Sequence, residues 1–299
     1  MDEVNTTIET DIKQQVRQFY DQIGWQEEGE GFYQNARFED LRPVSREYIH
    51  RCHLRVARHL NPDGKYLLDA GSGPIQYPEY LEYSRGYQAR VCADISMVAL
   101  QEARQRIGDR QNGGHGLFVV ADVANLPFEP EIFDGVVSLH TIHHLPESEH
   151  PQAYRELYRV LALHSEAVVV NGWADPPLMR FFVTPLKWMK QVLRKIHRRL
   201  GEPPLPQKSI NSKTGHNGSK PKGTFISKSN AAWMKQEIGS SMPLEILVWR
   251  SISVKFLRTF VHRRLGGRWF LRSLFWMEER FPHFFGEKGQ YPLIVIRKT

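Results

Sequence analysis

Short apolar runs and helical patterns alternate through the middle of the chain. Five apolar runs are typical of buried strands, at residues 66–70, 89–95, 116–121, 133–139 and 166–173. Between them, residues 97–107 and 151–163 carry apolar side chains at the spacing of amphipathic helices. This alternation predicts a parallel sheet with helices on both faces. The carboxyl ends of such strands share one edge, which is where ligands bind.

Periodic patterns also flank this central part. Residues 8–24 and 44–60 predict two helices before it, each ending near a glycine or an Asn-Pro pair. Residues 244–253 and 291–297 predict a sixth and a seventh strand after it.

The region after the fifth strand differs in character from the rest. The pattern predicts a helix between Thr184 and Gly201, then a loop rich in proline, glycine, serine, asparagine and lysine up to Thr224. We expect an N-terminal helical cap over residues 1–62 and one α/β domain over residues 63–299. Basic helical insertions are expected in that domain, at about 176–240 and 254–288.

The run Leu67-Leu68-Asp69-Ala70-Gly71-Ser72-Gly73-Pro74 joins a strand to a tight glycine turn. Gly71 and Gly73 carry no side chain where the backbone would approach a ligand closely. Residues 75–84 can open a helix whose N-terminus faces the same ligand. A loop of this kind is by itself a weak signal of nucleotide binding.

Two further carboxylates stand at the ends of the next predicted strands. Asp94 follows Gly71 by 23 residues and can accept hydrogen bonds from both hydroxyls of a ribose. Asp122 ends the third strand and can accept a hydrogen bond from an adenine amino group. Each aspartate alone would also suit a turn or a helix cap. Their joint presence favours a nucleoside site.

Together these segments resemble the class I S-adenosylmethionine-dependent methyltransferases of the type 11-like kind. The glycine loop is similar to the first motif of that family, residues 91–96 to its ribose-binding segment and residues 121–128 to its adenine-binding segment. Residues 133–145 resemble the fourth strand and its active-site loop. The resemblance implies a Rossmann-like, doubly wound α/β fold of seven strands, with an antiparallel last strand at residues 291–297.

The resemblance further implies S-adenosyl-L-methionine as the cofactor and assigns roles to residues. Asp69 would orient the methionine amino group, and Val123 would offer its backbone to adenine. Gly71 and Gly73 would admit the methionine portion. The other expected cofactor contacts are Ser72, Asp94, Ile95, Asp122, His140 and Tyr20. Ile75 is a departure, because the family often has a third glycine there.

The resemblance predicts in-line methyl transfer, in which a general base is needed only if the acceptor is a hydroxyl or an acidic carbon. His143 and His144 are the candidate catalytic bases after the fourth strand. In the family a histidine near this place often packs or orients the loop, so that alternative stays open. We expect no metal site, because His140 and His144 have no third ligand at matching spacing.

The N-terminal helix pattern includes an aromatic residue, Tyr20, that can cover the cofactor site. In the family such a helix commonly lies over the pocket, although ordinary amphipathic packing would give the same pattern. Arg42 can bind an acidic group of a substrate or form a surface ion pair.

The net charge of +7 hides a strong segregation. Residues 176–290 hold 22 lysines and arginines against 6 aspartates and glutamates. Three interpretations compete for this half: contact with an anionic membrane surface, packing on the sheet or a second subunit, and RNA binding. Nucleic acid is the least favoured partner, because the chain has no known RNA-binding module.

These observations favour methyl transfer to a small-molecule or lipid-like acceptor. An RNA-directed methyltransferase and a non-catalytic S-adenosylmethionine-binding protein are the alternatives. A nicotinamide-dependent dehydrogenase is disfavoured, because Gln76 stands where its fingerprint needs glycine. Only Cys52 and Cys92 are present, and we see no signal peptide or bilayer-spanning run, so a cytoplasmic protein with peripheral membrane contact is expected.

Overall fold

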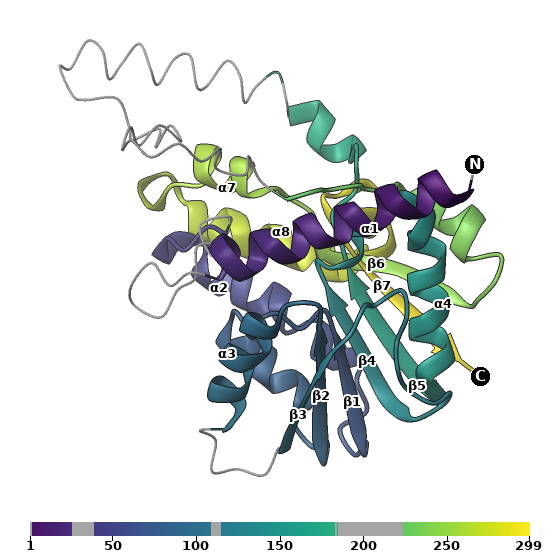
Figure 1. The fold of residues 1–299 in the computed structure, drawn as a ribbon. Helices are drawn as coiled ribbons and strands as arrows, with labels where there is room; N and C mark the ends of the chain where they lie inside the picture. Colours follow the sequence, from purple (N-terminus) through teal and green to yellow (C-terminus); the bar gives the residue numbers. More distant parts are fainter. Residues whose placement is uncertain (1, 26–38, 109–114, 183, 185–223) are drawn as a thin grey trace, which may run out of the picture.

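The computed structural model describes residues 2–25, 39–108, 115–182, 184 and 224–299. A seven-stranded sheet forms its centre, in the order β3-β2-β1-β4-β5-β7-β6 (Figure 1). The strands are β1 (Tyr66–Ala70), β2 (Ala89–Asp94), β3 (His115–Val120), β4 (Phe133–Leu139), β5 (Leu161–Val170), β6 (Leu244–Arg250) and β7 (Tyr291–Lys298).

Pairing in the sheet confirms the expected Rossmann-like α/β fold. β1 pairs in parallel with β2 and β4, and the parallel ladder continues to β3 and β5. β7 is antiparallel to both β5 and β6, as the resemblance implied for the last strand. β5 starts at Leu161, earlier than its apolar pattern indicated, because the preceding helix ends at Val160.

Helices cover both faces of the sheet. α3 lies on one face and α4 on the other (Figure 1), and their buried side chains belong to two separate apolar clusters. The described helices are α1 (Asp2–Phe19), α2 (Pro43–His53), α3 (Met97–Gly108), α4 (His150–Val160), α6 (Ala231–Trp233), α7 (Val254–Phe260), α8 (Gly267–Arg280) and α9 (Pro282–Lys288).

Several predicted helices have different bounds or types. The first continues from α1 through a π-helical turn, Tyr20–Gly24, and the second divides into α2 and a 3₁₀ turn, Val56–His59. The segment after the glycine loop forms only a 3₁₀ helix, Pro78–Ser84, so no α-helix N-terminus follows that loop. The helix predicted between Thr184 and Gly201, and the loop after it, lie outside the described residues apart from their end residues.

The C-terminal helices pack on β6 and α2 through a third apolar cluster. Its core includes Phe256, Leu257, Leu274 and Phe275. Packing therefore accounts for one side of this basic region, as one of the three interpretations expected. None of the helices in the described part of the chain is both long enough and apolar enough to cross a bilayer.

A buried carboxylate joins α8 to β6 and α2. Glu278 is fully buried and accepts hydrogen bonds from Tyr48 Oη at 2.7 Å and from Ser251. It also pairs with Arg55, whose Nη1 lies 2.9 Å from Oε2. Because both charges are shielded from water, the pair is costly to break.

We expect Glu278→Gln to lower the free energy of unfolding by about 3 kcal/mol, because it leaves the buried Arg55 charge with less compensation. Urea denaturation followed by circular dichroism measures the change. Glu279→Gln is the matched control, since Glu279 is one third exposed and also pairs with Arg55. An equal effect of both variants would contradict the role of burial.

Candidate active site

A cavity of about 550 Å³ lies at the carboxyl edge of the sheet and is lined in part by residues of α1. It is of the size that holds small-molecule ligands. The structure brings all the predicted site residues to this cavity: Tyr20, Asp69, Gly71, Ser72, Gly73, Asp94, Ile95, Asp122, Val123, His140, His143 and His144. Of these, only Tyr20 comes from outside the central α/β region.

The glycine loop needs its glycines for contacts within the chain. Gly71 and Gly73 have positive φ angles of 75° and 55°. A Cβ on Gly71 would lie 2.1 Å from the Thr141 side chain, and one on Gly73 would lie 3.2 Å from the Trp25 ring. The expectation that these glycines admit a ligand stays a prediction, and the structure adds that Thr141 and Trp25 occupy the space beside them.

Ile75 takes the conformation that a glycine would adopt with less strain. Its φ angle is 56°, although its branched side chain disfavours the left-handed region. The side chain is 1% exposed, and Arg106 donates a hydrogen bond to its carbonyl oxygen at 2.9 Å. Burial and this hydrogen bond thus retain the turn where the family often has glycine.

Asp94 joins the glycine loop to the turn after β2. Its Oδ2 accepts a hydrogen bond from the Gly73 amide at 2.9 Å, and its Oδ1 accepts one from Ser96 at 2.8 Å. Burial raises the pKa of this carboxyl to about 6, against the effect of the two amides. Each oxygen retains a lone pair for a further donor.

Arg90 of β2 holds the Asp69 side chain in place. The guanidinium forms a buried ion pair with Asp69 Oδ2 and donates to the Tyr80 carbonyl oxygen at 2.6 Å. Sequence reasoning missed Arg90, although an arginine within an apolar strand was a visible signal. Its position fixes the carboxylate at the end of β1, with Oδ1 left for another partner.

Asp122 forms a turn and an ion pair with α1. Its Oδ1 accepts from the Ala124 amide at 2.9 Å, and Lys13 Nζ lies 2.6 Å from Oδ2. Lys13 also pairs with Glu149. Although burial disfavours the charge on Lys13, these carboxylates hold its pKa above the usual value. Asp122 therefore stabilises a turn, which was the alternative interpretation of this residue, and it also lines the cavity.

The N-terminal segment is anchored over the cavity by side chains. Tyr20 Oη lies 2.7 Å from His144 Nε2, and its ring stacks on Trp25 at 5.0 Å. Asp21 accepts a hydrogen bond from Ser96 Oγ at 2.5 Å. These contacts place Tyr20 where a covering residue was expected.

The histidines after β4 are neutral and differ in their partners. His144 donates from Nδ1 to the Phe225 carbonyl at 2.8 Å, so its Nε2 accepts from Tyr20. Both nitrogens are thereby engaged, which fits the loop-orienting alternative. His143 donates from Nδ1 to Asn171 Oδ1 at 3.1 Å and leaves Nε2 unprotonated. His143 is therefore the better-placed candidate base.

Burial dominates the protonation of all three histidines at the cavity. It lowers the pKa of His144 to about 4 and that of His140 to about 3, and it holds the pKa of His143 well below its usual value. The His140 backbone is left-handed, with φ at 58°, directly after β4. Neutral imidazoles do not repel a cationic ligand.

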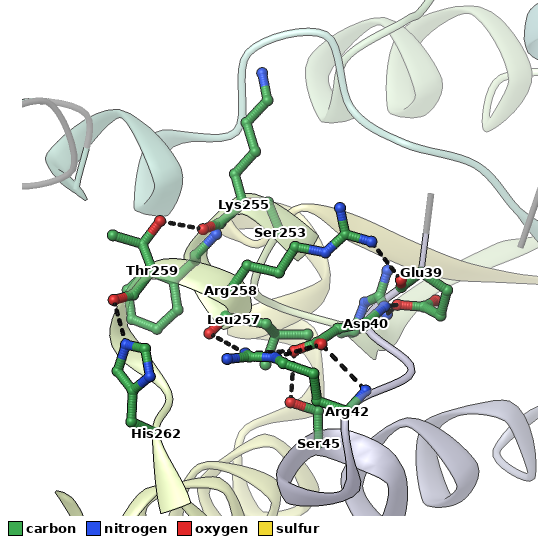
Figure 2. A network of polar contacts seen from close by, with 12 residues as sticks. Glu39, Asp40, Arg42, Ser45, Ser253, Lys255, Leu257, Arg258, Thr259 and His262 are labelled. Atoms are coloured by element: carbon green, nitrogen blue, oxygen red, sulfur yellow. Dashed lines mark hydrogen bonds and ion pairs between the residues drawn. The ribbon is translucent and has the colours of Figure 1, made fainter. Parts of the chain in front are cut away.

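Arg42 does not line the cavity. Its guanidinium forms a bidentate pair with Asp40 at 2.7 Å and donates to the Leu257 carbonyl oxygen at 2.8 Å (Figure 2). The ion-pair alternative for Arg42 therefore applies. Within the described ranges, no group of three or more histidine, cysteine or acidic side chains is arranged to hold a metal ion.

Comparisons with known proteins agree with this architecture. Residues 68–169 match the family model of a methyltransferase domain. The mouse (Mus musculus) eEF1A lysine and N-terminal methyltransferase is 29% identical over 125 residues, which cover 42% of this chain and 17% of that protein. This chain thus spans less than a fifth of the length of that relative.

A solved structure resembles nearly the whole chain. Geranyl diphosphate C-methyltransferase from Streptomyces coelicolor A3(2), in complex with Mg²⁺, geranyl diphosphate and S-adenosyl-L-homocysteine, has a TM-score of 0.52 at 14% identity. The match covers 96% of this chain and 98% of that one, and it shows a shared fold.

The family match falls on the strands and loops that build the cavity. Residues 68–169 are therefore similar to a methyltransferase domain, and the sheet that they help to build has a Rossmann-like strand order.

The buried histidines give stability a defined pH dependence. His144 is neutral in the folded chain down to about pH 4 but titrates near 6.5 when unfolded. Between these values the unfolded state binds more protons, so the free energy of unfolding falls as pH is lowered, by about 1.4 kcal/mol per pH unit for this residue. Urea denaturation between pH 7 and 4.5 measures the slope.

His144→Gln provides the comparison, because glutamine can still donate to Phe225 but does not titrate. We expect the free energy of unfolding of this variant to depend less steeply on pH than that of the parent, by about 1.4 kcal/mol per pH unit, the contribution of one titrating group. Parallel curves for the two proteins would contradict a buried, neutral His144.

Proposed function

We propose that this protein transfers the methyl group of S-adenosyl-L-methionine to a small-molecule or lipid-like acceptor by in-line displacement. The observation that carries the proposal is the convergence of Asp69, Asp94 and Asp122 on one cavity, from the ends of three adjacent strands. Binding of the nucleoside would use the carboxyl edge of the sheet, as in other open α/β folds.

The residues present fit this cofactor. Asp94 has one lone pair on each oxygen to accept from the two ribose hydroxyls, beyond its bonds to Gly73 and Ser96. Asp69 can accept from the methionine ammonium through its remaining oxygen, since Arg90 engages Oδ2. At the adenine end, Asp122 shares its Oδ2 with Lys13, and the Val123 backbone lies beside it.

When bound, S-adenosylmethionine supplies an activated methyl group on a positively charged sulfonium. The protein would bind and orient the reactants, which is the main source of rate in a displacement of this kind. Tyr20 and Trp25 would exclude water over the glycine loop. His143 Nε2 would accept the proton of an acceptor hydroxyl or acidic carbon.

Asp94→Ala should weaken S-adenosylmethionine binding by about 2–4 kcal/mol, because two charge-assisted hydrogen bonds are lost. Isothermal titration calorimetry on the full chain measures the affinity. The parent should bind S-adenosylmethionine and not NAD.

Asp134→Ala is the matched control for this variant. Asp134 also accepts from two backbone amides, those of Lys65 and Tyr66, but it lies at the opposite end of β1. Its replacement should leave cofactor affinity unchanged. If Asp94→Ala binds the cofactor as tightly as the parent, the proposed ribose position is wrong.

An exposed aromatic face on α8 supports a second part of the proposal, contact with an anionic membrane. Trp269 and Trp276 are 74% and 66% exposed, and their spacing of seven residues puts them on one side of the helix. Arg268 and Arg280 are exposed on the same helix. Exposed tryptophans beside arginines suit the boundary between lipid headgroups and acyl chains. Such contact would bring a lipid-like acceptor to the cavity.

We expect the protein to co-sediment with vesicles of phosphatidylserine and phosphatidylcholine at low salt, and less at high salt because the charges are screened. Replacing Trp269 and Trp276 by alanine should lower the partition coefficient by about tenfold or more, from the lost apolar burial. Leu163→Ala is the control, since Leu163 is 53% exposed on β5. Equal sedimentation of the parent and the tryptophan variant would contradict the proposed membrane contact.

A further inference from the structure

The cavity is divided by the order of the strands. The glycine loop and the three aspartates stand at the carboxyl ends of β1, β2 and β3, which form one side of the sheet. The opposite side, formed by β4, β5, β7 and β6, contributes His140, Gly172, Trp249, Arg250 and Tyr291. If the adenosyl group lies over the first side, as proposed above, the methyl acceptor must occupy the second. We call this second part the acceptor side.

Charge is distributed unequally between the two sides. Of the three aspartates at the nucleoside side, Asp122 pairs with Lys13 and Asp69 with Arg90, whereas Asp94 has no cationic partner among the described residues, which leaves that side negative. On the acceptor side, Arg250 and Lys228 stand against a single carboxylate, Glu39, among the described lining residues. The acceptor side is therefore positive, and its histidines are neutral at pH 7 because burial lowers their pKa. A cationic sulfonium suits the first side, and an anion suits the second.

Arg250 is built into the wall of the acceptor side. It is 2% exposed, and its Nη1 donates to Glu39 Oε1 at 2.5 Å. Its guanidinium carbon lies 5.1 Å from the ring centroid of Trp249 and 4.7 Å from that of Tyr291. Its buried Nε has no hydrogen-bond acceptor within the described part of the chain. A buried arginine donor without an acceptor is costly. Because Arg250 also lines the cavity, an oxyanion bound there would meet its positive charge.

Glu39 is held in place independently of Arg250. Arg258 of α7 donates to the Glu39 carbonyl oxygen at 2.7 Å, and the adjacent Asp40 is fixed by Arg42 and Ser45 (Figure 2). The carboxylate therefore neutralises part of the Arg250 charge from a fixed position. The remaining positive charge of the acceptor side comes from Lys228.

Lys228 brings its ammonium group to the end of β5. A Cβ on Gly172 would lie 3.2 Å from Lys228 Nζ, so the missing side chain at Gly172 lets the ammonium approach. Loss of hydration and the neighbouring Lys255 lower its pKa, which shows that its positive charge is poorly compensated. No ion pair joins Lys228 to another described residue. An anionic ligand would relieve both effects.

The remaining walls are aromatic. Tyr77, Tyr80, Trp249 and Tyr291 line the cavity, and Trp249 lies between His53 and His140, with ring centroids 5.3 and 5.1 Å away. Such walls favour a flat or unsaturated apolar body over a sugar or a peptide.

We propose that the methyl acceptor is a small molecule with an unsaturated apolar body and an anionic group, a carboxylate or a phosphate, that binds between Lys228 and Arg250. This inference rests on the proposed methyltransferase function and deepens it. Lys228 and Arg250 position the acceptor and take no part in the bond changes.

The test uses the full chain saturated with S-adenosylhomocysteine, whose own affinity is measured first by calorimetry. Benzoate and phenyl phosphate are then titrated as carboxylate and phosphate probes, with benzamide as the neutral counterpart of benzoate. We expect at least one anionic probe to bind about tenfold more tightly than benzamide, the contribution of one charge-assisted hydrogen bond. The preferred probe identifies the anionic group.

Lys228→Gln should lower the affinity for the anionic probe by about tenfold and leave the affinity for S-adenosylhomocysteine unchanged. Lys288→Gln removes the same charge from an exposed position that does not line the cavity, and it should change neither affinity. Because Arg250→Met alone would leave Glu39 buried without its partner, Glu39→Gln combined with Arg250→Met is the second variant. It should weaken the anionic probe without unfolding the chain.

Three results would overturn the proposal, and they differ in meaning. If S-adenosylhomocysteine binds but no anionic probe exceeds benzamide, the acceptor class is wrong while the methyltransferase function stands. If Lys228→Gln weakens S-adenosylhomocysteine instead of the probe, the lysine holds the carboxylate of the cofactor. If S-adenosylhomocysteine does not bind to the parent, the proposed function fails and the acceptor assignment fails with it.

Discussion

The parallel pairing of β1 with β2 is the constraint on which the site depends. The ladder aligns Ala70 with Ala93, and the amides of Gly71 and Ser72 continue it by donating to the Ala93 carbonyl oxygen at 2.7 and 3.2 Å. The Gly73 amide then reaches Asp94. The glycine loop is therefore fixed to the neighbouring strand along its length, and the two acidic strand ends cannot separate without breaking the sheet.

Most charges at the cavity have a partner of opposite sign or are removed by a shift in pKa, whereas Asp94 and Lys228 form no ion pair with another described residue. Asp69 pairs with Arg90, and Asp122 pairs with Lys13. The histidines instead lose their charge, since burial lowers the pKa of His140 to about 3. Desolvation makes an unpaired buried charge costly, which explains why the cavity holds pairs and neutral rings.

The cover of the cavity comes from segments far apart in the sequence. Tyr20 and Lys13 of the N-terminal helix contact His144 after β4 and Asp122 after β3. Across the cavity, Glu39 contacts Arg250 at the end of β6. These contacts connect the beginning of the chain to both sides of the sheet. A change at Lys13, Tyr20 or Glu39 therefore acts directly on the lining of the cavity.

The sequence determined the α/β class and all seven strands to within a few residues. Its resemblance to a known family pointed to the aspartates, glycines and histidines at the carboxyl edge, but not to Lys228, Trp249 and Arg250. It could do so because apolar periodicity and strand-end carboxylates are local signals. Only the tertiary structure decided that Arg90 supports Asp69, that Thr141 and Trp25 fill the space beside the glycines, and that His144 is engaged on both nitrogens. Those outcomes depend on contacts between side chains that are far apart in the sequence, and such contacts follow no fixed spacing along the chain.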